Sequence, residues 1–195
     1  MRHDSRFKNI RTFSRGFTLV ELIVSISIFA MMTALVVAKY GNFNQSVLLT
    51  NLAYDMALTI RTAQTYGVSV RQEGGDFKYP YGVSFIAGDS TFVFFADTDG
   101  TKNGIYDDGT DAKLNSYTLK RGAKIKDVCI GSSSASCSSE SVLSITYTRP
   151  DPDARICHIY CEATIPEYAR ITIEGLDGST RAVVVRKNGQ ISVEE

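Results

Sequence analysis

The sequence predicts an α+β protein, in which one long N-terminal helix packs on a domain built from an antiparallel β-sheet. Two observations carry this prediction. Apolar residues follow helical spacing as far as Tyr66, and beyond it short alternating runs are separated by turns that contain glycine. A helix followed by a series of strands is typical of the α+β class. Hydrophobic residues make up 44% of the 195 residues and charged residues 22%, so we expect a folded body rather than a disordered one.

The first half of the predicted helix has the composition of a membrane span. Residues 17–38 read FTLVELIVSISIFAMMTALVVA and carry a single charge, Glu21. About 20 apolar residues are needed to cross a bilayer as a helix. The run is longer than the apolar region of an ordinary secretory signal, roughly 7–15 residues, and no small-residue cleavage site follows it. We therefore predict a transmembrane segment at 17–38.

The charges divide unevenly between the N-terminal tip and the rest of the chain. Five of the 21 basic residues and one of the 21 acidic residues fall in residues 1–16, so the remainder carries four more acidic than basic groups. Basic residues beside a span stay on the cytoplasmic side. We expect residues 1–16 in the cytoplasm, a single pass through the cytoplasmic (inner) membrane, and a periplasmic or extracellular body. A mildly acidic body argues against nucleic acid as a partner.

The second half of the predicted helix, residues 39–66, is amphipathic. Its apolar positions follow the i, i+3, i+4, i+7 pattern of a helix face. They are Leu49, Leu52, Ala53, Met56, Ile60 and Ala63. The opposite face is expected to carry Asn51, Asp55, Thr59 and Gln64. The pattern predicts one helix from about Thr18 to about Tyr66, loosened near Gly41-Asn42.

Residues 67–195 form the predicted β-rich domain. Its strands are expected at Tyr81–Phe85, Thr91–Ala96, Tyr117–Leu119, Val142–Tyr147, Arg170–Glu174 and Ala182–Arg186. Asp-Gly within Leu176–Ser179 and Asn-Gly within Lys187–Gly189 are typical of hairpin turns, because glycine there readily adopts positive φ.

A carboxylate within a membrane span is costly, and Glu21 therefore needs an explanation. Thr18-x-x-Glu21 has the form of a capping box, in which the glutamate belongs to the helix start. The alternative is a buried anion that pairs with a cation.

The residues around this glutamate, Gly16-Phe17-Thr18-Leu19-Val20-Glu21, resemble the cleavage and methylation motif of type IV prepilins and type II secretion pseudopilins. The resemblance implies the pilin fold and a leader, residues 1–16, that prepilin peptidase removes between Gly16 and Phe17. It also implies N-methylation of Phe17 and pairing of Glu21 with such an amine during assembly. The implied function is that of a filament subunit.

The body is similar to minor pseudopilin H of type II secretion and its minor-pilin relatives, through Ala57–Arg71, the strand-rich domain and a closing VVVRKNGQI run. This implies a minor subunit whose partners are other pilin or pseudopilin subunits, the peptidase, the inner-membrane assembly platform and membrane lipid. Some relatives bind DNA through basic residues after the final glycine. Here Gln190–Glu195 is acidic, so nucleic acid is not an expected partner. The alternative function is a membrane-anchored, extracytoplasmic module that binds calcium or another ligand.

The four cysteines are Cys129, Cys137, Cys157 and Cys161, an even number in the body. Outside the cytoplasm they predict up to two disulfides, and four cysteines allow three connectivities. Cys129–Cys137 and Cys157–Cys161 could each pair locally, but four-residue spacing in a straight strand spans about 13 Å, too far for a bridge. Cys157–Cys161 thus requires a turn, and without one the cross pairing is favoured.

An acidic, glycine-rich loop follows Ala96. Calcium prefers six to eight oxygen ligands on such a flexible loop. The candidate ligands are Asp97, Asp99, Asn103, Asp107 and Asp111. Counted from Asp99, the loop matches an EF-hand loop only in part, because Thr110 stands where a bidentate glutamate belongs. The alternative is a plain turn, since Asp, Asn and Gly recur in turns for conformational reasons alone. Calcium is the one cofactor that the sequence suggests.

The sequence contains no recognisable catalytic motif. His3 lies in the predicted leader, His158 lies between two cysteines, and no nucleophile elbow, zinc-binding HExxH or P-loop is present. We therefore expect a structural protein and not an enzyme.

Overall fold

The structure is a computed structural model that describes residues 16–69, 73, 75, 78–161 and 166–194, with the backbone alone for residues 39–44. Residues 1–15 of the predicted leader, which spans 1–16, lie outside the described residues. The chain divides into two compact units, Met1–Gly41 and Asn42–Glu195, and each is described by itself. Helix α1 (Leu19–Val68) is assigned without interruption, close to the predicted bounds.

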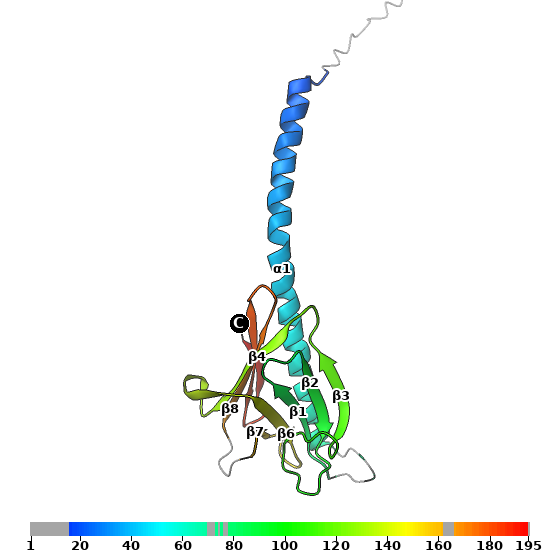
Figure 1. Cartoon of the computed structure of the whole chain (residues 1–195), viewed down its shortest axis with the longest axis vertical. Helices are drawn as coiled ribbons and strands as arrows, with labels where there is room; N and C mark the ends of the chain where they lie inside the picture. Colours follow the sequence, from blue (N-terminus) through cyan, green and yellow to red (C-terminus); the bar gives the residue numbers. More distant parts are fainter. Residues whose placement is uncertain (1–15, 70–72, 74, 76–77, 162–165, 195) are drawn as a thin grey trace, which may run out of the picture. The chain divides into compact units, whose positions relative to one another are not determined.

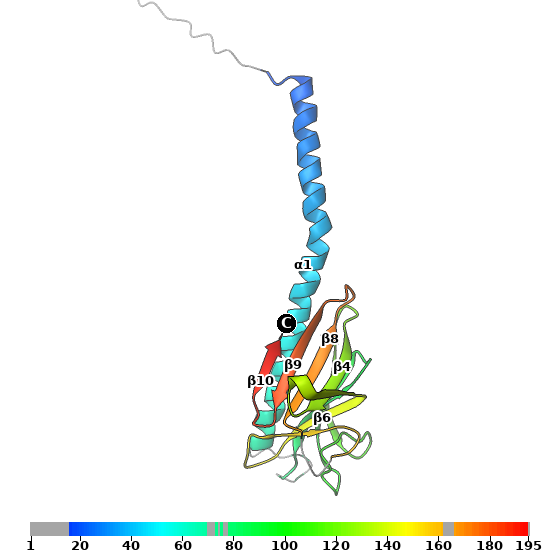
Figure 2. The ribbon, with the colours of Figure 1, turned by 90° about the vertical axis from the view of Figure 1, so that its left-hand side faces the viewer.

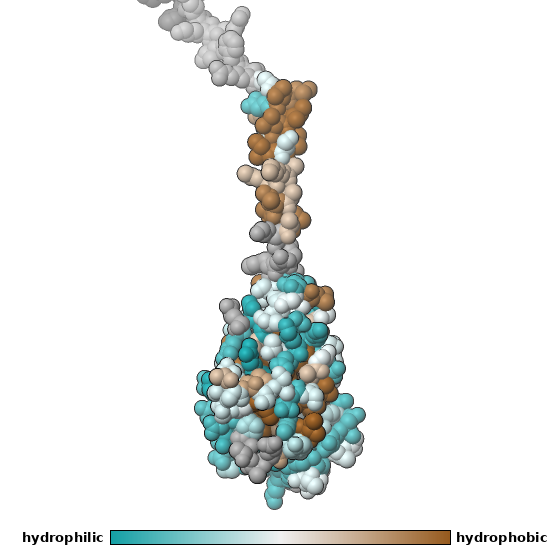
Figure 3. Space-filling view, turned by 60° about the vertical axis from the view of Figure 1, so that its left-hand side comes forward, coloured by the Kyte–Doolittle hydropathy of each residue, from teal (hydrophilic) through white to brown (hydrophobic). Residues whose placement is uncertain are grey.

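The N-terminal unit contains the first part of α1. Residues Leu19–Ala38 have a mean hydropathy of 2.3, and none of them is buried within the structure. On the face that Figure 3 shows, hydrophobic side chains cover this part of the helix. In length and composition this segment fits a single-pass membrane anchor.

The second unit contains two antiparallel sheets, where the sequence predicted one sheet domain (Figures 1 and 2). The first has the order β3-β2-β1-β6-β7, with β1 (Tyr81–Ile86), β2 (Thr91–Ala96), β3 (Ala112–Thr118), β6 (Val142–Tyr147) and β7 (Ala154–Cys157). The second has the order β10-β9-β8-β4-β5, with β4 (Lys124–Gly131), β5 (Cys137–Glu140), β8 (Tyr168–Glu174), β9 (Thr180–Arg186) and β10 (Ile191–Glu194). A 3-10 turn, η1 (Ser134–Ser136), precedes β5. The α+β class is confirmed.

One hydrophobic core joins the second part of α1 to both sheets. All six residues of the predicted apolar stripe are buried. They pack with Val83 and Phe85 of β1 and with Ile171 and Val183 of the second sheet. At the end of the helix, Gly67 lies so close to Tyr147 of β6 that a β-carbon there would collide with the backbone. The stripe therefore fixes the helix to the sheets.

One residue of the predicted polar face, Thr59, was assigned wrongly, and another, Gln64, is half-buried. Thr59 is buried, and its hydroxyl donates to the carbonyl of Asp55 at 2.9 Å, which satisfies the group inside the helix. Gln64 does not simply face solvent, because its side-chain amide donates to the carbonyls of Pro152 and Gly189 at 3.0 and 3.1 Å. Periodicity alone cannot show that a polar side chain is satisfied by such contacts.

Both predicted hairpin turns of the second sheet are present. Gly178, between β8 and β9, has φ +78°, and Gly189, between β9 and β10, has φ +80°. These turns set the register in which Ile171 pairs with Val183 and Val185 with Ile191.

Candidate functional site

The region of the predicted cleavage site lies at the start of α1. Gly16 and Phe17 precede the helix, and the Phe17 side chain is 74% exposed. A β-carbon on Gly16 would meet no atom of the described residues within 4 Å. Thr18 caps the helix, because its hydroxyl accepts a hydrogen bond of 3.2 Å from the backbone N–H of Glu21. Of the two hydrogen bonds of a capping box, the one from the N–H of the fourth residue to the cap hydroxyl is thus present.

The other polar side chains of the apolar segment are satisfied within the helix. The hydroxyls of Ser25, Ser27 and Thr33 each donate to the carbonyl four residues earlier, at 2.7–2.8 Å. Such bonds reduce the cost of a hydroxyl in lipid. Within the described part of the chain, no hydrogen bond or ion pair involves the carboxylate of Glu21. Among the polar side chains of Leu19–Ala38, the carboxyl group of Glu21 is therefore the one without a partner in the described part of the chain.

The body contains two disulfides, each between cysteines that are near one another in the sequence. Cys129–Cys137 joins β4 to β5, with Cα atoms 5.6 Å apart, and Cys157–Cys161 has Cα atoms 4.7 Å apart. The second pairing forms because β7 ends at Cys157 and the chain bends through residues 158–160. His158 lies in this bend, buried and in edge contact with Tyr160. Of the pairings that the sequence left open, the two local ones, Cys129–Cys137 and Cys157–Cys161, are therefore present, and the cross pairing is not.

The acidic loop runs between two neighbouring strands of the first sheet. β2 ends at Ala96 and β3 begins at Ala112, and these two residues are paired. Asp97 and Asp111 therefore leave the sheet side by side. Together with Asp99 they form a cluster in which one carboxylate oxygen of each residue lies within 4.8 Å of the other two.

The remaining two predicted ligands, Asn103 and Asp107, interact with each other. The Asn103 amide donates to Asp107 Oδ2 at 2.8 Å, and Asn103 Oδ1 accepts the N–H of Ile105 at 2.7 Å. Asp107 does not belong to the carboxylate cluster. The side chains therefore do not meet as an EF-hand loop counted from Asp99 would require. The cluster contains Asp97, which precedes that loop, and lacks Asn103 and Asp107.

Most carboxylate oxygens of the cluster accept hydrogen bonds from the loop itself. Asp111 accepts the backbone N–H groups of Thr98, Asp99 and Asp107 at 2.9–3.2 Å. Asp99 accepts those of Thr101 and Lys102 and also the Thr101 hydroxyl. These contacts are turn chemistry, in which side chains replace backbone partners.

Asp97 differs from the other two. The residue is fully buried, and its Oδ2 accepts the N–H of Gly104 at 2.8 Å, whereas its Oδ1 receives no hydrogen bond from the described residues. Burial raises the pKa of Asp97 from 3.8 to about 7; the hydrogen bond from the Gly104 N–H opposes this rise, and the neighbouring Asp99 and Asp111 add to it. Among the described residues, the hydrogen bond from Gly104 thus offsets only part of the cost of burying a charge at Asp97.

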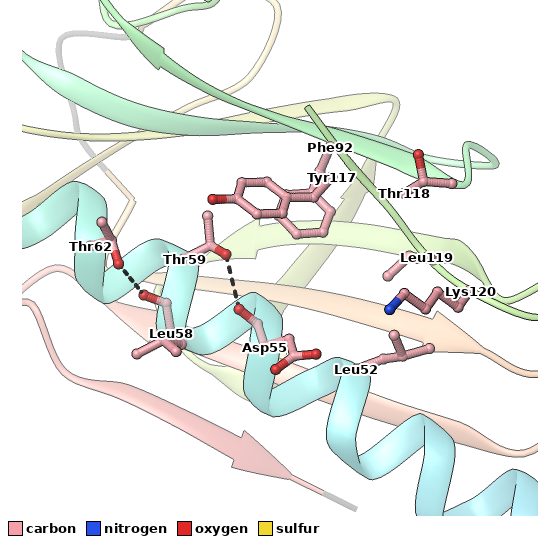
Figure 4. A pocket seen from close by; sticks show the side chains of 10 residues that line it. All are labelled: Leu52, Asp55, Leu58, Thr59, Thr62, Phe92, Tyr117, Thr118, Leu119 and Lys120. Carbon is pink, nitrogen blue, oxygen red and sulfur yellow. Dashed lines mark hydrogen bonds between the residues drawn. The ribbon is translucent and has the colours of Figure 1, made fainter. Parts of the chain in front are cut away.

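A separate groove of about 310 Å³ lies between α1 and the end of β3 (Figure 4). Phe92 and Tyr117 stack at 5.2 Å over one side, and Thr59 and Thr62 donate to helix carbonyls on the other. Among the described residues its lining consists of Leu52, Asp55, Leu58, Thr59, Thr62, Phe92, Tyr117, Thr118, Leu119 and Lys120. These side chains include no histidine, cysteine or pair of carboxylates, so the groove supplies no acid–base pair of that kind.

Comparison with known proteins gives one match. Residues 11–37 match the family model described as the prokaryotic N-terminal methylation motif. No curated protein and no solved structure matches the chain. The matched region contains Gly16, Phe17, Glu21 and nearly all of the exposed apolar segment.

Proteins with this motif are structural rather than enzymatic. The match ends before the body, so it gives no support to the finer resemblance to minor pseudopilin H. The motif, the apolar helix and the two disulfides together support a type IV pilin-like protein with a pilin or pseudopilin type of function.

Proposed function

We propose that this chain is a minor structural subunit of a type IV pilus or a type II secretion pseudopilus. The observation that carries the proposal is the Glu21 carboxylate. It is the unsatisfied polar group of an otherwise apolar segment in which all three hydroxyls have internal partners. A carboxylate in that setting costs free energy unless a cation meets it.

Processing would create that cation. Cleavage between Gly16 and Phe17 by prepilin peptidase leaves a new amine at Phe17, which the enzyme then N-methylates. Glu21 is the fifth residue of the resulting mature chain. The hydrogen bond from the Glu21 N–H to Thr18 supports a helix that begins beside this amine. In the assembled filament, Glu21 of one subunit pairs with the Phe17 amine of another.

The partners follow from this assembly. They are other pilin or pseudopilin subunits, the peptidase, the inner-membrane assembly platform and membrane lipid. The body lies on the periplasmic or extracellular side, a location that the two disulfides favour because such bonds persist in oxidising compartments. The minor class rests on the resemblance of the body sequence to minor pseudopilin H.

The decisive experiment compares Glu21→Val with Ser27→Ala in full-length chains expressed with the peptidase and wild-type subunit. Glu21→Val should insert and fold, because the apolar side chain eases insertion. It should nevertheless be depleted from filaments relative to its membrane pool, as mass spectrometry of both fractions would measure. Ser27→Ala removes a hydroxyl that is already satisfied within the helix, and should be incorporated like wild type. Equal incorporation of Glu21→Val and wild type would refute the proposal.

The alternative is a membrane-anchored binding module, and the acidic loop is the feature that favours it. The same experiment separates the two functions. A module that acts alone would remain in the membrane fraction as a monomer, whatever residue stands at position 21.

A further inference from the structure

We propose that the loop between β2 and β3 is a calcium site built from Asp97, Asp99 and Asp111. The sheet itself brings the first and last of these together, because each adjoins one residue of the pair Ala96–Ala112. The separation of Asp97 and Asp111 therefore depends on two paired strands, and only Asp99 is positioned by the loop itself. Such preorganisation reduces the entropy lost on binding.

The buried Asp97 oxygen points to a ligand. A plain turn accounts for Asp99 and Asp111, since their oxygens accept backbone N–H groups of the loop. It does not account for Asp97 Oδ1, which is buried beside two further carboxylates and receives no hydrogen bond from a backbone N–H or a hydroxyl group of the described residues. Leaving a buried acceptor unpaired costs about 1–3 kcal/mol, and more for a charged group.

Among the described residues, no ion pair supplies the missing cation. Over the described residues, the ion pairs are Lys113–Asp108, Lys124–Glu174 and Lys126–Glu174, and none of them includes a member of the cluster. Arg155 approaches the loop but donates to the carbonyl of Lys102. A bound cation would both pair with Asp97 Oδ1 and offset the repulsion among the three carboxylates.

The ligand atoms select the kind of ion. All three side chains offer hard oxygen atoms, and the neighbouring Cys157 and Cys161 are held in a disulfide. Zinc prefers nitrogen and sulfur ligands, and magnesium requires a near-ideal octahedron that retains several waters. Calcium accepts irregular sets of carboxylates, carbonyls and waters at 2.3–2.6 Å. With three carboxylates and no bidentate glutamate, the dissociation constant should fall at about 10⁻⁴–10⁻³ M, the range of extracellular modules.

Isothermal titration of the full-length chain in detergent with calcium chloride tests the site. We expect a dissociation constant in the stated range and a higher melting temperature in about 10 mM calcium than in chelator, because that concentration exceeds the weakest expected constant tenfold. Magnesium chloride should give a smaller shift. Asp97→Asn should weaken calcium binding by at least about tenfold, since loss of groups that merely support a metal already costs that much.

Asp108→Asn is the matched control. Asp108 belongs to the same loop, but its side chain is 82% exposed and contacts Tyr106 and Lys113 rather than the cluster. It should keep the wild-type affinity. Melting in chelator shows that each variant is folded, and asparagine at position 97 should not unfold the loop because it also accepts the Gly104 N–H. Three outcomes would each overturn the proposal: no calcium response, an equal response to magnesium, or an equal loss in Asp97→Asn and Asp108→Asn.

Discussion

The backbone N–H of Gly104 donates a hydrogen bond of 2.8 Å to Oδ2 of Asp97. Gly104 has φ +84°, and a β-carbon on it would lie 3.2 Å from Cys161 Sγ and 3.3 Å from Cys157 Sγ. The disulfide at the end of β7 therefore packs against the residue that holds the buried carboxylate. This contact links the second disulfide to the acidic loop.

The first prediction concerns this link. Replacing Cys157 and Cys161 together by serine should increase amide exchange at Gly104, because the loop loses the cross-linked surface against which it packs. Replacing Cys129 and Cys137 by serine is the control, since that bridge joins β4 to β5. Either change should cost up to about 3 kcal/mol of unfolding free energy, the chain-entropy value for loops of up to 15 residues. Hydrogen exchange read at Gly104 distinguishes them, and equal acceleration in both double variants would contradict the link.

The second prediction is a pH dependence in chelator. The folded-state pKa of Asp97 is raised from 3.8 to about 7, chiefly by burial. Between these values the folded state binds one proton more than the unfolded state, so the free energy of unfolding falls as pH rises. Below about pH 4 the contribution of Asp97 is fully present, and it is lost as pH rises through about 7. The loss should be at most a few kcal/mol.

Asp97→Asn isolates this contribution from the other titrating groups. The amide resembles the neutral acid in size and carries no charge at any pH, so the variant should lose the part of the slope due to Asp97. Urea unfolding of both proteins at pH 5 and pH 8 measures it. In chelator at pH 8 the variant should be the more stable protein, and a less stable variant would show that Asp97 is accommodated as an anion.

The sequence predicted the helix and the hairpins well because their signals are local. The stripe from Leu49 to Ala63 has helical spacing, and the Asp-Gly and Asn-Gly turns have their own conformational preference. Four strands, β4, β5, β7 and β10, were missed. β5 is a serine-rich run without alternation, and β7 and β10 have only four residues each, so the surrounding sheet rather than local preference determines them.

The acidic loop could be recognised from composition, but its geometry could not. A register counted along the chain treats Asn103 and Asp107 as ligands, although they bond to each other. Asp97 and Asp111 come together through the pairing of β2 with β3, and no pattern within the loop encodes this. The start of α1 is different, because Gly16, Phe17 and Glu21 form a contiguous motif that is readable without a structure.

The third prediction concerns processing. Gly16→Leu should leave a precursor that prepilin peptidase does not cut, because the added side chain prevents close approach of the backbone to the enzyme. The described part of the chain should tolerate the change, since a β-carbon at Gly16 meets none of its atoms within 4 Å. Mass spectrometry of membrane extracts should find the mature N-terminus at Phe17 in the wild type and an intact leader in the variant. A variant cut as efficiently as wild type would refute this prediction, and an uncut wild type would refute the cleavage position.

The fourth prediction compares two glycines with the same backbone conformation. Gly178 and Gly189 have φ +78° and +80°, and they occupy the turns at the two ends of β9. Alanine in this conformation costs roughly 1–2 kcal/mol wherever it stands. Around Gly178 a β-carbon meets nothing within 4 Å, so Gly178→Ala should cost that amount alone.

Gly189→Ala should cost more, because a β-carbon there would collide with the Gln64 amide and the Pro152 carbonyl. The Gln64 amide bonds to the Pro152 and Gly189 carbonyls, and each such bond contributes about 0.5–1.5 kcal/mol. We therefore expect Gly189→Ala to lower the unfolding free energy by roughly 2–4 kcal/mol, as urea titration would measure. In a Gln64→Ala background the difference between the two glycine variants should shrink, since part of the obstruction and both bonds are already gone. An unchanged difference in that background would mean that Gln64 does not hold the β9–β10 turn against the helix.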